Sequence, residues 1–168
     1  MRRACTMVAL TVVMALMLAP DTATRAAAQG GTGAQGSGMG ASGDSDVPAH
    51  HTAPPKKTAA MAPILPAEDL VGPSFQHPAQ VKAYLLAAKI SEVIYQMPCY
   101  CHCDRSVGHS SLRSCFESTH GAHCATCLQE LYYAYAQHKK GKTAAQIRKG
   151  IIAGEWEKVD LQTAASTE

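Results

Sequence analysis

A dense group of cysteines near the middle of the chain limits its fold more than any other feature. Six of the seven cysteines and four of the eight histidines lie between positions 99 and 127. Thiolate sulfurs are soft donors that select Zn(II), Cu(I) or similar ions. Because the two halves of this segment together offer at least four sulfurs, we predict that it binds a soft transition metal. The candidate cofactors are Zn and Cu(I).

The spacing within the segment indicates how the sulfurs could converge. Alternate side chains of the run Cys99-Tyr100-Cys101-His102-Cys103 would lie on one side of an extended loop. Cys124 and Cys127 open a predicted helix, one turn apart, where the helix dipole lowers the pKa of a thiol. We rank the candidate metal ligands as Cys101, Cys103, Cys124 and Cys127, then Cys99 and Cys115, then His109 and His120, with His102 and His123 as further candidates.

Two other interpretations of the cysteines stay open. Six cysteines in an exported chain commonly form disulfides, and three bridges would stabilise a small domain without a metal. The pair Cys124 and Cys127 at a helix start also resembles the active pair of thiol–disulfide oxidoreductases. Covalent attachment of haem requires a histidine directly after a Cys-x-x-Cys pair. Leu128 follows Cys127, so this cofactor is excluded. We assign no catalytic residue, because no acid–base or nucleophilic group of residues is apparent.

The N-terminus has the layout of a secretory signal peptide over residues 1–28. A basic start with Arg2 and Arg3 precedes an apolar run from Met7 to Ala19, and three alanines stand before Gln29. This pattern predicts a periplasmic or extracellular location. Retention of the run as a membrane anchor is the alternative, although it is shorter than the roughly 20 residues that span a bilayer. We expect no membrane span after cleavage.

The rest of the chain divides by composition. Residues 29–66 are rich in Gly, Ala, Ser and Pro, which predicts a disordered linker in which His50 and His51 are solvated. Residues 67–157 contain the clustered cysteines and the periodic apolar positions, and we predict a cysteine-rich helical domain there. Residues 158–168 are predicted to be a flexible tail.

Apolar positions at steps of three and four residues predict the helices of this domain. The first spans about Pro78 to Met97 and ends at Pro98. The second spans about His123 to Lys140, and the third begins after Thr143 as N-cap. A short helical turn is expected near residues 111–118. Because no segment alternates as a strand does, the predicted fold class is all-α, a small helical bundle with a cysteine-rich loop.

The charge of the chain gives little support for a polyanionic partner. Removal of residues 1–28 would leave equal numbers of basic and acidic residues, because three arginines and one aspartate are lost from 15 and 13. Lys139, Lys140, Lys142, Arg148 and Lys149 gather at helix ends, where such residues are usually solvated. We therefore predict no nucleic-acid binding. A protein partner for metal handover is expected only if the role is transport.

The order of these motifs resembles one known family. Pro98-Cys99-Tyr100-Cys101-His102-Cys103 is followed by Gly108-His109, Cys115-Phe116, His120-Gly121, Cys124, Cys127-Leu128 and Gly141-Lys142-Thr143. This order is similar to the PCYCGC-motif family of exported or lipid-anchored bacterial proteins, over about residues 97–152. His102 stands where the motif has glycine, and no lipid-attachment cysteine is present. The resemblance implies a shared fold and cysteine site and implies no function.

Overall fold

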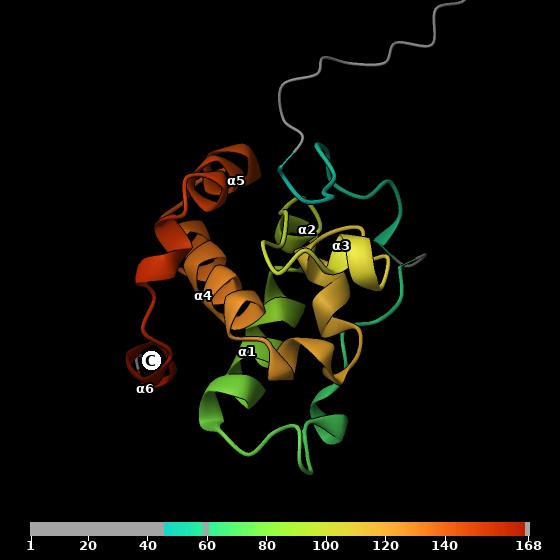
Figure 1. The fold of residues 1–168 in the computed structure, drawn as a ribbon, viewed down its shortest axis with the longest axis vertical. Helices are drawn as coiled ribbons and strands as arrows, with labels where there is room; N and C mark the ends of the chain where they lie inside the picture. The colour runs from blue at the N-terminus through green and yellow to red at the C-terminus, as the bar shows by residue number, and fades with distance from the viewer. Residues whose placement is uncertain (1–45, 59–60, 167–168) are drawn as a thin grey trace, which may run out of the picture. The chain divides into compact units, whose positions relative to one another are not determined.

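The computed structural model describes residues 46–58 and 61–166, and these residues form helices and turns with no β-strand among them (Figure 1). The predicted all-α class is therefore confirmed. The α-helices are α1 (Pro78–Lys89), α2 (Ser91–Ile94), α3 (Cys103–Ser106), α4 (Ala125–Lys139), α5 (Ala144–Ile152) and α6 (Leu161–Ser166). The 3-10 turns are η2 (Ala67–Asp69), η3 (Leu112–Phe116), η4 (Thr119–His123) and η5 (Glu155–Lys158).

Helix α4 lies at the centre of the bundle and contacts α1, α5, η3, η4 and η5 (Figure 1). Its inward face buries Cys127, Leu128, Leu131 and Ala134, which recur at the three- and four-residue steps of one helix face. Burial of this apolar face, rather than helix propensity, supplies most of the stability of such a helix. The N-cap and the first turn of α4 each carry a cysteine, so the packing that fixes α4 also fixes one side of the cysteine cluster.

The first predicted helix is interrupted near its end. Helix α1 stops at Lys89, and Ile90 leaves helical geometry with φ −122° and ψ 29° before the short α2 begins. A β-branched residue has a reduced preference for helical backbone, which favours a break at this position. The change of direction lets Ile90, Ile94 and Met97 all reach the core, where each is almost completely buried.

Two other predicted elements are confirmed. The hydroxyl of Thr143 accepts a hydrogen bond from the N–H of Gln146, whose side chain accepts from the N–H of Thr143, a capping box at the start of α5. Gly141 precedes it with φ +79°, a conformation that glycine adopts without strain. The turn expected near residues 111–118 is η3.

Segments outside the predicted domain also contact it. Within the predicted linker, Pro48 is buried and the ring of His51 stacks on Tyr95 at 3.8 Å between centroids. Within the predicted tail, α6 packs on α1, where the Nζ of Lys82 donates to the carbonyl of Ala165 at 3.1 Å. These contacts are side-chain contacts without periodicity, and composition alone did not indicate them. The predicted signal peptide and linker residues 29–45 lie outside the described residues.

None of the helices in the described part of the chain is long and apolar enough to cross a membrane.

Candidate metal centre

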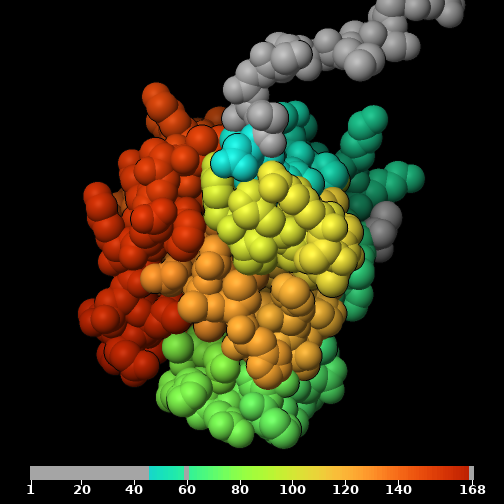
Figure 2. Space-filling model, in the orientation of Figure 1, coloured from blue at the N-terminus to red at the C-terminus, as the bar shows by residue number. Residues whose placement is uncertain are grey.

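Three segments that are separate in sequence bring six cysteines together. Cys99 and Cys101 lie on the loop after Met97, and Cys103 is the first residue of α3. Cys115 lies in η3, Cys124 is the N-cap of α4, and Cys127 lies in the first turn of α4. Figure 2 shows the outer surface of this region, in yellow and orange, between the N-terminal described residues in cyan and α1 in green.

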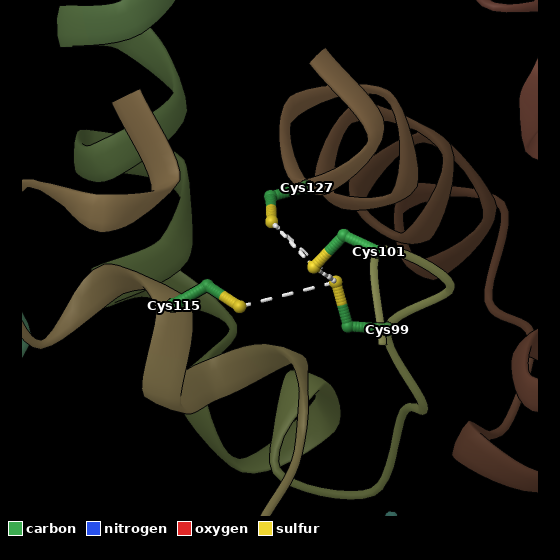
Figure 3. Close-up of side chains that lie close together, drawn as sticks. All are labelled: Cys99, Cys101, Cys115 and Cys127. Carbon is green, nitrogen blue, oxygen red and sulfur yellow. Dashed lines mark hydrogen bonds between the residues drawn. The ribbon is translucent and has the colours of Figure 1, made fainter. Parts of the chain in front are cut away.

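Four of the sulfurs form a tight group in which every pair lies within 4.8 Å: Cys99, Cys101, Cys115 and Cys127. Their side chains point toward one another from three directions (Figure 3). The Sγ of Cys99 lies 3.2 Å from that of Cys101, 3.4 Å from that of Cys127 and 3.9 Å from that of Cys115. The Sγ atoms of Cys101 and Cys127 are 3.6 Å apart.

These separations fit metal ligands better than disulfides. A disulfide joins sulfurs at about 2.05 Å, and all six cysteines are free thiols in the structure. Four sulfurs placed tetrahedrally at about 2.3 Å from a zinc ion lie about 3.8 Å from one another. Four of the six sulfur separations in this group are 3.2–3.9 Å and every pair lies within 4.8 Å, so only small adjustments would enclose such an ion.

A second group joins two of these sulfurs to other donors. Cys101, Cys103, Cys115 and His120 each offer one ligand atom, and all four atoms lie within 4.8 Å of one another. The Nδ1 of His109 lies 3.1 Å from the Sγ of Cys103 and 3.3 Å from that of Cys115. Burial, and then the neighbouring His120, lower the pKa of His109, which favours the neutral imidazole that a metal ligand needs.

The cysteine loop is fixed to α4 by a buried carboxyl group. Oε1 of Glu130 accepts a hydrogen bond from the N–H of Tyr100 at 2.7 Å, and the Glu130 side chain is fully buried. Its Oε2 has no hydrogen-bond partner. Burial raises the pKa of Glu130 to about 8. This residue therefore holds the loop between Cys99 and Cys101 against the helix that carries Cys127.

The same loop contains a strained residue. His102 has φ 54° and ψ 32°, and it is the one residue other than glycine with positive φ among those that the structure describes. The turn forms because the N–H of His102 bonds to the carbonyl of Cys99 at 3.1 Å, and α3 starts at the next residue. The left-handed conformation reverses the chain so that the sulfurs of Cys101 and Cys103 lie 3.2 Å apart.

Tyr84 of α1 fixes the other side of the cluster. Its hydroxyl donates to the carbonyl of Ser118 at 2.6 Å and accepts from the N–H of Ala122 at 3.1 Å. The backbone of Gly121 passes so close to η3 that an added Cβ would lie 2.7 Å from the carbonyl oxygen of Cys115. Only glycine allows this approach, so Tyr84 and Gly121 together hold η4 against η3 and fix the position of Cys115.

The thiols influence one another strongly. The pKa of Cys101 is lowered by hydrogen bonds with neighbouring thiols, of which Cys115 has the largest effect. The pKa values of Cys99, Cys115 and Cys127 are raised, and in each case the hydrogen bond with Cys101 is the largest cause. The physical cause is that one thiolate, once formed, is stabilised by thiol donors and makes a second thiolate unfavourable. A bound cation would remove this penalty, because metal ligation requires deprotonated cysteines.

Cys124 lies outside both close groups, although we ranked it among the first ligands. It is partly exposed. Its pKa is raised, chiefly by a hydrogen bond with Cys101, whereas we expected the helix N-terminus to lower this pKa. Cys99 and Cys115, which we ranked second, lie in the tightest group. His102 is in neither group, and the Nε2 of the exposed His123 lies 2.9 Å from the hydroxyl of Ser74.

Two positioning residues, Glu130 and Tyr84, were missing from the sequence prediction. A signal for Glu130 was available, because it lies three residues after Cys127 and beside Leu131 on the inward face of a helix. A charged residue at such a position is rarely fully buried unless it has a partner. Tyr84 gave no comparable signal, because its two partners are more than 30 residues away.

A family model described as a protein of unknown function with the PCYCGC motif matches residues 57–158, which include the whole cysteine cluster. No curated protein and no solved structure was found to match the chain.

Proposed function

We propose that this chain, which belongs to the family of proteins with the PCYCGC motif, binds a soft transition metal, Zn(II) or Cu(I), through clustered thiolates. The observation that carries the proposal is the convergence of Cys99, Cys101, Cys115 and Cys127 from three segments to within 4.8 Å. Thiolate sulfur is the donor that both ions prefer. The remaining candidates, Cys103, Cys124, His109 and His120, border this group.

The properties of the pair Cys124 and Cys127 support a metal site over thiol–disulfide exchange by this pair. Cys115 and Cys127 have no exposed surface, and Cys99 is only 3% exposed. An attacking thiol must be accessible and carry appreciable thiolate. Within the CxxC pair, Cys127 is inaccessible and the pKa of Cys124 is raised, by Cys101 foremost. Neither sulfur of this pair therefore has the properties of an attacking thiol, whereas both lie near a site that a cation would complete.

We propose further that the protein acts outside the cytoplasm, in the periplasm or the extracellular space. The signal-like N-terminus, with its basic start, apolar run and small residues before Gln29, supports this location. A metal held there would serve structure, sequestration or handover to another protein. Cys101 and Cys124 are partly exposed, and this exposure favours exchange over a permanently enclosed ion.

Native mass spectrometry of the full chain, reduced and then loaded separately with Zn(II) and Cu(I), tests the proposal. We expect a mass gain that corresponds to bound metal and that a chelator removes. The variant Cys127→Ser should weaken binding, because it removes a buried ligand, and the control His138→Ala, at an exposed position outside the cluster, should not. A metal-free mass under all loading conditions, or a loss of about two mass units per cysteine pair as disulfides form, would refute the proposal.

A further inference from the structure

The cluster contains more sulfur than one metal ion can bind. Contacts of 3.2 Å from Cys101 to Cys103, 3.4 Å from Cys103 to Cys115 and 3.9 Å from Cys115 to Cys99 continue the tight group into a closed ring of sulfurs. A tetrahedral site takes four ligands. Cys103 is therefore a fifth close sulfur, 3% exposed, and a single ion would leave it without a ligand role.

The two ligand groups share two members. Cys101 and Cys115 belong to both groups, Cys99 and Cys127 belong only to the first, and Cys103 and His120 belong only to the second. A thiolate sulfur has several lone pairs and can bridge two soft ions. Two groups of four that share two sulfurs have the composition of a site for two ions with two bridges.

The second group faces the surface. A cavity of about 300 Å³ is lined by Cys101, Cys103 and His120, together with Ser106, His123 and Cys124. His120 and Cys101 are partly exposed, whereas Cys115 and Cys127 are completely buried. An ion in the second group would therefore lie at the bottom of an open cavity, on the solvent side of an ion in the first group.

Two imidazoles lie on this side of the cluster, and only that of His120 is a ligand of the second group. The rings of His109 and His120 meet edge to face at 4.9 Å between centroids. The Nδ1 of His109 already contacts both Cys103 and Cys115, so its ring can donate a hydrogen bond to these sulfurs while His120 binds the metal. His109 is thus placed as a positioning residue for the second group.

We infer that the cluster holds two ions of one soft metal, which the sulfurs of Cys101 and Cys115 bridge. The inner ion is completed by Cys99 and Cys127, and the outer ion by Cys103 and His120. The inference rests on the proposed function and adds the number of ions and the assignment of each ligand. It also accounts for charge. Five thiolates with one divalent ion have a net charge of −3, whereas five thiolates with two divalent ions have a net charge of −1.

Titration with Co(II), a spectroscopic substitute for Zn(II), tests the bridges in the wild-type full chain, without any variant. The first equivalent should give the electron paramagnetic resonance signal of isolated high-spin Co(II). The second equivalent should reduce that signal, because bridging sulfurs couple the two ions magnetically, while sulfur-to-cobalt absorption continues to rise. A signal that grows in proportion up to two equivalents would overturn the inference, because it would show two ions without a bridge.

Variants assign the outer ion. The double variant Cys103→Ser/His120→Ala should bind one Zn(II) equivalent against two for the wild type, and the exposed His138→Ala should keep two. One equivalent in both wild type and double variant would overturn the second ion and leave the proposed function intact. No bound metal in the wild type would overturn both. Two equivalents retained by the double variant would overturn the assignment of Cys103 and His120.

Discussion

Substitution of His102 gives a direct test of the cysteine loop. His102 holds a left-handed backbone with φ 54° between Cys101 and Cys103, at the position where the family motif has glycine. We compare His102→Ala with His102→Gly. Both variants remove the imidazole and its edge contact with Tyr100, at 6.0 Å between ring centroids, so the comparison isolates the backbone.

The expected magnitude follows from two opposing effects. A residue with a Cβ in the left-handed region costs roughly 1–2 kcal/mol. Glycine removes this cost but adds about 0.4–1 kcal/mol of entropy to the unfolded chain. His102→Gly should therefore be more stable than His102→Ala by about 1 kcal/mol. Metal stoichiometry should be the same in both variants, because His102 lies outside both ligand groups.

The assay is urea unfolding of the reduced protein at a fixed excess of Zn(II), followed by circular dichroism. The control is Ala136→Gly, an exposed position inside α4 where glycine should cost about 1 kcal/mol. Glycine should therefore have opposite effects at the two positions. If glycine were less stable than alanine at position 102 by the amount lost at position 136, the left-handed conformation and its role in the loop would be refuted.

Three other predictions concern the surroundings of the cluster. Because burial raises the pKa of Glu130 from 4.5 to about 8, native-state stability should fall as the pH rises from 4.5 to 8. The free energy of unfolding should change by at most about 1.4 kcal/mol per pH unit. Glu130→Gln should lack this contribution, which urea unfolding at several pH values would measure. Equal pH dependence of the wild type and the variant would contradict the prediction. In the reduced, metal-free chain, an alkylating reagent should modify Cys101, which is partly exposed and has a lowered pKa, before the four buried cysteines, as peptide mass spectrometry would detect, and metal should slow the reaction. Gly150→Ala should lower stability by about 1–3 kcal/mol, because the new Cβ would overlap the hydroxyl of Tyr133 and displace its bond to Glu155; an unchanged urea midpoint would refute this close packing.

Local patterns predicted the helical elements well because each has a local cause. The apolar steps of α4, its end near Lys140 and the N-cap at Thr143 depend on residues within one or two turns. The break at Ile90 was missed, because the apolar period continues across it to Met97. The packing of residues 46–58 and of α6 was also missed, since single contacts such as His51 on Tyr95 leave no period in the sequence.

Local patterns did not predict which cysteines lie close together. Periodicity placed Cys124 beside Cys127 on one face of a helix, but Cys124 is the N-cap, with φ −122° and ψ 108°, so its side chain does not follow the helix phase. Cys115 has no periodic neighbour, and its place in the centre depends on Tyr84, 31 positions earlier, and on the close approach of Gly121. The motif thus identifies the donors, whereas contacts between distant residues determine which donors lie close enough to share an ion. For this reason the number of ions, and not only the affinity, should respond to substitution of Tyr84 or Gly121, which bind no metal but fix the position of Cys115.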